Sequence, residues 1–247
     1  MKSFISMLKT EGKLSIRDMN MIIFAIIMPT IVLVILGIIY GQNPAFEGAD
    51  YSFLEQSFGA LSSIAICAGG LMGLPILISE YRERKILKRF QVTPVSPSMI
   101  LFVHLCIYII YSLISVILLW VISGLLWKFR MRGSIIAFLG AWLLVLFSVL
   151  SIGMLVGGIA KNSKSASVIA SLLYFPMLVF SGATLPYEVM PKTMQYVVDV
   201  MPLTQGIKLM KAAVLGTPVN NVIIPIVVMV IIGIICTICA IRFFKWE

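Results

Sequence analysis

The sequence predicts an all-α integral membrane protein whose single domain, residues 1–247, crosses the bilayer six times. Its residues are 60% hydrophobic and 12% charged, with a mean hydropathy of +1.07. Soluble domains average about 45–50% apolar and about 25% charged residues, so this composition excludes an ordinary soluble fold. A spanning helix needs about 20 apolar residues, which leaves room for about six or seven spans and for no soluble catalytic domain.

Residues 1–18 predict an amphipathic helix that lies along the cytoplasmic membrane surface. Its apolar and basic residues fall on opposite sides: Phe4, Ile5 and Leu8 on one, Lys2, Lys9 and Lys13 on the other. No short apolar region here is followed by a small-residue cleavage site, so we expect no removable signal peptide.

Six apolar stretches are each long enough to cross the ~30 Å hydrocarbon layer. They are residues 21–40, 57–79, 97–127, 134–160, 165–183 and 219–241. The third and fourth are longer than a span requires and should tilt or project beyond the bilayer. Prolines within four of the stretches predict kinked, closely packed helices. These prolines are Pro29, Pro75, Pro176 and Pro225.

The basic residues predict the orientation. Thirteen lysines and arginines lie on the side of both termini and six on the opposite side. Because cytoplasmic segments carry the excess of basic residues, both termini are expected in the cytoplasm. The basic cluster at 128–132 does not follow this rule, because it lies on the predicted outer side.

Residues 184–218 form the long connection before the last span, on the predicted outer side. Apolar residues recur at helical spacing in 190–200 and 203–215, which predicts two short amphipathic helices between prolines. These helices either re-enter the membrane beside the bundle or lie flat among the head groups, and both interpretations stay open.

The six stretches contain no Asp, Glu, Lys or Arg, and only one histidine, His104. Ion-driven carriers usually need ionisable groups within the membrane, so the pattern argues against a self-powered secondary carrier. The phosphate-binding pattern G-x-x-x-x-G-K-[ST] is also absent. If the protein carries out energy-dependent transport, another chain must therefore hydrolyse the nucleotide that powers it. The net charge of +9 is attributed to topology and to membrane lipids rather than to nucleic acid.

Few residues are candidates for chemistry. His104 lacks a second metal ligand or base nearby in sequence, and Cys236 and Cys239 lie on an apolar helix, so no catalytic group and no metal site is expected. The alternative of another class, an intramembrane serine protease, depends on Ser181. Its nucleophile motif is incomplete because Val179 replaces the upstream glycine.

Small residues at four-residue spacing allow helix backbones to approach closely. Contacts inside the chain and contacts between two subunits are both open interpretations. The pairs of interest are Gly37 with Gly41 and Gly153 with Gly157.

The cytoplasmic loop 80–96 alternates charges of both signs around a short apolar ridge and ends in prolines. This pattern predicts a short helix, which is either a solvated charged surface or a binding site for a partner protein. Here the sequence resembles the ABC type-2 permease family, the six-span subunits of drug, lipid and polysaccharide ABC exporters. The loop E-R-K-I-L-K-R-F-Q-V-T-P-V-S is similar to the family pattern E-R-E-x-G-T-L-E-x-L-x-x-T-P-[VL]-S. The matching positions are Glu83, Arg84, Leu87, Thr93, Pro94 and Ser96.

A second similarity covers F-S-G-A-T-L-P-Y-E-V-M-P and V-M-P-L-T-Q-G-I-K-L-M-K at the outer end. Three departures from the family pattern concern details of the coupling contact and of the outer turn. They are Lys85-Ile86 in place of Gly-Thr, Met201 in place of Asn, and Lys211 where Arg is common.

The resemblance implies a permease that pairs with a second permease chain, the same or a related one. Two nucleotide-binding ATPase subunits would dock on the loop; ATP and Mg would bind to them and no cofactor to this chain. The implied ATPase-coupling residues are Glu80, Arg82, Glu83, Arg84, Leu87 and Phe90. The implied outer gate contains Pro186, Glu188, Pro191, Asp199 and Pro202.

The apolar spans favour a hydrophobic or amphipathic cargo, such as a drug, an antibiotic or a lipid. A polysaccharide or glycolipid is the alternative, because aromatic residues suited to sugars also occur in the spans. They are Tyr108, Tyr111, Trp120 and Tyr174.

Overall fold

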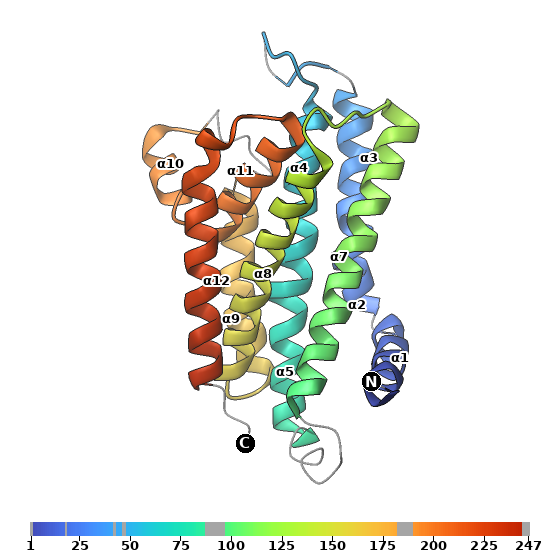
Figure 1. Cartoon of the computed structure of the whole chain (residues 1–247), viewed down its shortest axis with the longest axis vertical. Coiled ribbons are helices and arrows are strands. Elements are labelled where there is room, and N and C mark those ends of the chain that lie inside the picture. The colour runs from blue at the N-terminus through green and yellow to red at the C-terminus, as the bar shows by residue number, and fades with distance from the viewer. Residues whose placement is uncertain are drawn as a thin grey trace.

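Helices are the regular elements of the computed structural model, which describes residues 2–17, 19–41, 43–45, 48–86, 97–181 and 190–243. Within these residues no strand forms, and six helices are long and apolar enough to cross a membrane. They run side by side as a bundle (Figure 1). The predicted all-α membrane fold with six spans is confirmed. The six helices are Ile23–Tyr40, Phe53–Glu83, Ser98–Trp127, Ile135–Ile159, Ser163–Phe180 and Asn220–Phe243.

The first two spans each consist of consecutive helical segments. After α1 (Lys2–Arg17) and α2 (Met19–Ile22), the first span consists of the π-helical η1 (Ile23–Ile27) and α3 (Met28–Tyr40). The second contains α4 (Phe53–Cys67), the π-helical η2 (Ala68–Gly73) and α5 (Leu74–Glu83). The remaining spans are α7 (Pro97–Trp127), α8 (Ile135–Ile159), α9 (Ser163–Phe180) and, after the 3₁₀ turn η4 (Val219–Val222), α12 (Ile223–Phe243).

A proline closely follows each π-helical segment. Pro29 and Pro75 are the second residues of α3 and α5, and proline offers no N–H to the carbonyl four residues earlier. The preceding N–H instead bonds to the carbonyl five residues back, as from Leu74 to Gly69. The kinks predicted at these two prolines are therefore widened turns, and η1 packs against η2.

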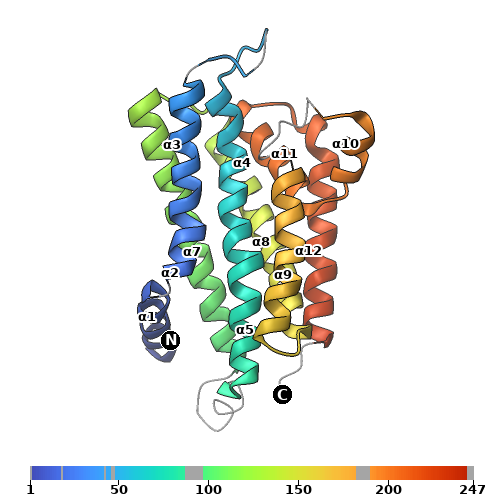
Figure 2. The same ribbon diagram turned by 180° about the vertical axis from the view of Figure 1, so that it is seen from behind.

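The second span lies at the centre of the bundle (Figures 1 and 2). In its most apolar stretch 72% of the residues are buried, against 22% in the first span and 17% in α9. Leu54, Phe58 and Leu61 are at most 2% exposed, and the Phe58 ring stacks on Phe129 with 4.6 Å between centroids. Close packing of this kind holds helices together in lipid, where apolar burial alone gives little preference for protein over membrane.

The second span also begins and ends outside its predicted range, at Phe53 rather than Ser57 and at Glu83 rather than Ser79. The Oγ of Ser52 accepts a hydrogen bond from the N–H of Glu55, whose carboxylate accepts one from Ser52 in return. This capping box fixes the helix start earlier than the apolar pattern suggests.

Hydroxyl groups join α8 to α12. The Oγ of Ser148 donates to the carbonyl of Met229 at 2.8 Å, and the hydroxyls of Ser151 and Thr237 lie 2.9 Å apart. Such bonds between membrane helices contribute about 0.6 kcal/mol each. They fix how α12 is rotated against α8.

Glycines allow close contacts between helices of the same chain. Gly37 lies against α7, and Gly157 lies against α5. Gly153 lies against the carbonyl of Gly70 in η2, so any larger residue there would collide with backbone. Gly41 ends α3 with φ of 52°, a left-handed conformation that favours glycine.

Two short helices, α10 (Lys192–Val198) and α11 (Pro202–Leu215), lie at the end of the bundle opposite α1 (Figure 1). Nine of the 14 residues of α11 are buried, and the helix packs against α4, α8 and α12. A Cβ at Gly59 of α4 would lie 2.6 Å from the backbone nitrogen of Lys211, so the two backbones touch. α11 is therefore inserted among the spans, whereas α10 exposes 75% of Tyr196.

Candidate coupling site and outer cavity

Charged residues gather at the last turn of α5, at the end of the bundle where α1 lies (Figure 1). Of the six predicted coupling residues, Glu80, Arg82, Glu83 and Arg84 are found there. Leu87 and Phe90 lie outside the described residues.

Arg82 points into the chain and is only 8% exposed. Its Nη1 donates to the carbonyls of Gly157 at 3.0 Å, Gly158 at 2.8 Å and Ala160 at 2.9 Å. These are the last carbonyls of α8, which lack partners within the helix and carry partial negative charge. The guanidinium group therefore caps the C-terminal end of α8.

Glu83 binds the element that follows. Its carboxylate accepts a hydrogen bond of 3.0 Å from the N–H of Ser163, the first residue of α9. A negative charge is favourable at this position because the first N–H groups of a helix are the positive end of its dipole. Arg82 and Glu83 thus hold the junction between α8 and α9 from both sides, each with the charge that its helix end favours.

Other residues of the turn face outward. Arg84 and Glu80 form an ion pair of 2.8 Å with side chains 69% and 39% exposed. An exposed pair of this kind contributes only about 0–1 kcal/mol. Lys85, which follows the C-cap residue Arg84, has a φ of 54°. These outward side chains form a mixed-charge surface beside the buried Arg82.

The same turn also binds α1 and α7. The hydroxyl of Tyr81 donates to the Glu11 carboxylate at 2.9 Å, and the Nε2 of His104 lies 3.6 Å from the same oxygen. The Tyr81 and His104 rings meet edge to face at 5.1 Å. Glu11 is 9% exposed and His104 2% exposed, so a buried polar cluster joins three helices.

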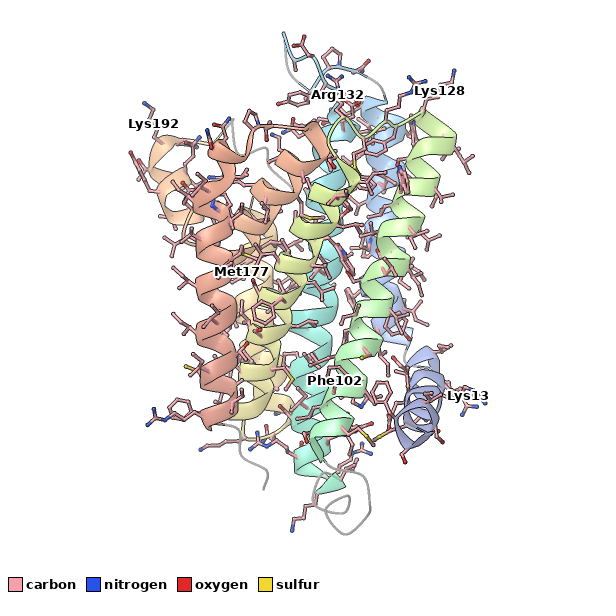
Figure 3. All side chains as sticks on the ribbon, viewed as in Figure 1. Lys13, Phe102, Lys128, Arg132, Met177 and Lys192 are labelled. Carbon is pink, nitrogen blue, oxygen red and sulfur yellow. The ribbon has the colours of Figure 1, made fainter. Side chains whose placement is uncertain are left out.

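Sequence reasoning missed Glu11, although a signal was present. Phe4, Leu8 and Glu11 recur at helical spacing, which places a carboxylate on the apolar face of α1. A charge on that face needs a partner inside the protein, and Tyr81 with His104 supplies one. In Figure 3, Phe102 of α7 and α1, with its labelled Lys13, lie at the same end of the bundle.

At the opposite end, Pro191, Asp199 and Pro202 flank α10 and α11. Asp199 ends α10, its carboxylate accepts a hydrogen bond of 2.5 Å from Lys208, and its carbonyl accepts one of 2.5 Å from Gln205. Both donors belong to α11, so the turn between the two helices is held in place. Pro186 and Glu188 lie outside the described residues.

A cavity of about 540 Å³ lies beside this turn, between α4, α11 and α12. Its volume is within the range of small-molecule sites in proteins, about 300–1,000 Å³. Its lining is mixed, with apolar side chains from α4, α11 and α12 and polar side chains from α4, α11 and the segments that flank the helices. The polar lining includes Ser181, Asp199, Thr204, Gln205, Lys208 and Lys211.

A family model, ABC-2 type transporter, matches residues 2–215 and so covers most of the chain. The chain belongs to the ABC-2 type transporter family. The resemblance seen in the loop and at the outer end is confirmed, and the chain is a multi-pass protein of the plasma membrane.

Relatives of this ABC-2 chain include the inner membrane transport permease YhhJ of Escherichia coli (strain K12), 27% identical over 209 residues. That match covers 82% of this chain and 54% of YhhJ, so the chain spans about half the length of this curated relative. Nodulation protein J of Rhizobium leguminosarum bv. viciae is 30% identical over 116 residues, 42% of each protein.

The ABC-2 chain does not bring Ser181 and His104 together. α9 begins beside Glu83, close to the His104 cluster, and its 18 residues rise about 1.5 Å each. Ser181, just after the last residue of α9, is therefore roughly 27 Å away from that end. A serine and histidine so far apart cannot act as nucleophile and base. Within the described residues, no group of three potential metal ligands occurs either.

Proposed function

We propose that the chain is the membrane subunit of an ABC exporter that moves a hydrophobic or amphipathic cargo outward, powered by a separate ATPase subunit. The observation that carries this proposal is the last turn of α5. There, outward-facing charged side chains lie beside residues that form hydrogen bonds to α1, α8 and α9. Family membership supports an ATPase partner in general.

The geometry suggests how force on this turn reaches the spans. An ATPase that displaces residues 80–86 would pull the α8–α9 junction through Arg82 and Glu83, and α1 through Tyr81. Charged hydrogen bonds to backbone resist such displacement better than an exposed ion pair does. In this mechanism Arg82 transmits movement inside the chain, and Glu80 and Arg84 contact the partner. ATP and Mg would be bound by the ATPase.

The proposed orientation places α1 and the end of α5 in the cytoplasm. The positive-inside pattern supports it, and the last turn of α12, which ends at Phe243, lies at the same end as α1 (Figure 1). A second permease chain would pack on the exposed apolar faces of the bundle. Only 17% of the most apolar stretch of α9, and 22% of that of the last span, are buried in the single chain.

The burial of the aromatic residues bears on the cargo. Tyr108, Tyr111 and Tyr174 are 6–7% exposed, whereas Trp120 is 46% exposed. A polysaccharide path needs exposed rings on which sugars can stack. Three buried rings therefore support an apolar or amphipathic cargo over a polysaccharide.

The test is affinity purification of the chain from its native membrane in mild detergent, with mass spectrometry and an ATPase assay. We expect a near-stoichiometric P-loop ATPase with the wild type and a marked loss of it with Arg84→Glu. Lys161→Glu is the matched control, because Lys161 is also an exposed basic residue at the same end of the bundle. A clean homo-oligomer without ATPase, recovered repeatedly, would contradict the exporter proposal.

A further inference from the structure

We propose that Arg132 is a positioning residue that latches the outer ends of α4 and α11 together, and that this latch opens when cargo is released. The opening step rests on the proposed exporter function, whereas the latch itself rests on the contacts of Arg132. This residue belongs to the connection between α7 and α8, residues 128–134, which we call the outer strap. It lies at the end of the bundle opposite α1 (Figure 3).

The backbone of the outer strap binds the C-terminal end of α11. The N–H groups of Arg132 and Gly133 both donate to the carbonyl of Val214, at 3.1 Å and 2.9 Å. This carbonyl belongs to the last turn of α11, where carbonyls lack a partner within the helix. Any side chain at Gly133 would collide with the carbonyl of Ala213, so the strap and the helix end lie in direct contact.

The side chain of Arg132 binds the start of α4. Its Nε lies 3.2 Å from the Oε2 of Glu55, whose side chain is only 12% exposed. Its Nη2 donates to the backbone carbonyl of Asp50, just before the helix. The same Oε2 of Glu55 accepts the 2.9 Å bond from the N–H of Ser52 in the capping box. The guanidinium group is therefore held by a carboxylate that the helix start already fixes.

Two kinds of contact join the strap to α4. The Phe129 ring is 9% exposed and stacks on Phe58, which buries both rings. Arg132, by contrast, exposes 44% of its side chain, and an ion pair that water reaches contributes little to stability. Because water can replace the ion pair at low cost, it can open while the aromatic contact stays closed.

The latch joins two walls of the outer cavity. Phe53 of α4 lines this cavity two residues before Glu55, and Leu215 of α11 lines it directly after Val214. Separation of the two helix ends would therefore widen the cavity. In the proposed exporter, the latch would open to let cargo leave and close behind it.

Hydrogen exchange, followed by mass spectrometry on the full chain in mild detergent, measures how often the two helix ends separate. Arg132→Gln should speed exchange at the start of α4 and in the strap about fivefold, because the ion pair is lost. Glu55→Gln removes the same ion pair but keeps a side chain that suits the capping box, and should have the same effect. The two changes together should have no larger effect than either alone, because both act on one contact.

The control for exchange is Arg130→Gln, since Arg130 is another exposed arginine of the strap. Its exchange should match that of the wild type. Additive effects of Arg132→Gln and Glu55→Gln, or no effect of either, would show that the pair is not a latch. This measurement needs no ATPase and so does not depend on the exporter proposal.

The opening step is tested by a reversible bridge. In a background without the four native cysteines, Arg132→Cys and Glu55→Cys are joined by a bis-methanethiosulfonate reagent in the complex with the copurified ATPase. We expect the bridge to lower ATP turnover about tenfold, because a conformational step is blocked, and dithiothreitol to restore it. A bridge between Lys128→Cys and Arg130→Cys, both within the strap, should leave turnover unchanged.

Equal turnover before and after the bridge forms would overturn the opening step, because the cycle would then proceed with the latch closed. An equal loss of turnover with the control bridge would also overturn it, since any crosslink in the strap would then suffice. A chain that repeatedly copurifies no ATPase would contradict the exporter proposal and, with it, the opening step. The exchange experiment would still decide whether Arg132 joins the two helix ends.

Discussion

Arg82 carries a positive charge into the helix bundle, where three carbonyl oxygens of α8 replace water around its Nη1. A buried charge costs stability unless it is fully hydrogen-bonded. The α8 terminus supplies the acceptors for Nη1 and has its own orphan carbonyls satisfied in return. The two groups are therefore mutually dependent.

We expect Arg82→Met to lower the free energy of unfolding by about 3 kcal/mol, because several carbonyls lose a charged donor at once. Denaturation of the purified chain in SDS, followed by circular dichroism, measures this change. Arg84→Gln is the control from the same turn; its side chain is 69% exposed, and the loss should stay below about 1 kcal/mol. Equal losses in the two variants would show that Arg82 is not a cap.

Tyr81 offers a second residue-level test. Tyr81→Phe removes the donor to Glu11, which leaves the buried carboxylate without this hydrogen bond and with the His104 Nε2 3.6 Å away. We expect a loss of about 1–2 kcal/mol and faster tryptic cleavage within α1, at Lys9 or Lys13. Unchanged cleavage would mean that α1 is held by its apolar contacts, such as Phe4 with Phe102, rather than by this cluster.

At the scale of elements, α8 offers a matched pair of glycines. Gly153 lies against the carbonyl of Gly70, whereas Gly140 has no atom within 4 Å of a built Cβ. Gly153→Ala should therefore force α8 away from η2 and lower stability by about 1–3 kcal/mol. Gly140→Ala should be neutral or slightly stabilising, since alanine favours the helix. Apparent melting temperatures of the two variants check this difference.

The elements also show what sequence reasoning can reach. The length of the apolar stretches alone predicts the six helices, because a membrane span needs about 20 consecutive apolar residues and the six stretches meet this requirement. The ends are harder, since Ser52 and Glu55 extend α4 beyond its apolar run through a capping box. The π-helical form of the kinks at Pro29 and Pro75 depends on how the neighbouring helices pack, which local sequence does not specify.

At the scale of the whole molecule, the candidate site was predictable only in part. Glu80, Glu83 and Arg84 follow from the loop pattern, because it is contiguous in sequence. The cluster of Glu11 with His104 joins segments far apart in the chain, and the cavity at Lys211 draws its walls from several helices. Both depend on the tertiary arrangement, which neighbouring residues in the sequence do not specify.

The orientation is tested on the whole molecule by cysteine labelling. In a background without the four native cysteines, Lys192→Cys should react with a membrane-impermeant maleimide added to intact cells. Arg84→Cys should react only after permeabilisation, because the positive-inside pattern places this end in the cytoplasm. Both positions are exposed in the single chain, so in cells that lack the ATPase partner access depends on the membrane side alone. The reverse labelling pattern would invert the proposed topology.

The π-helical turn in the middle of the second span has a consequence for the angular register of the two halves. Bonding to the fifth rather than the fourth residue adds one residue to a turn, which offsets the later side chains by about 100° around the axis. A helical wheel drawn continuously from Phe53 to Glu83 would therefore misplace the last turn. Deletion of one residue from η2 would swing Arg82 away from α8, even though every remaining side chain is unchanged.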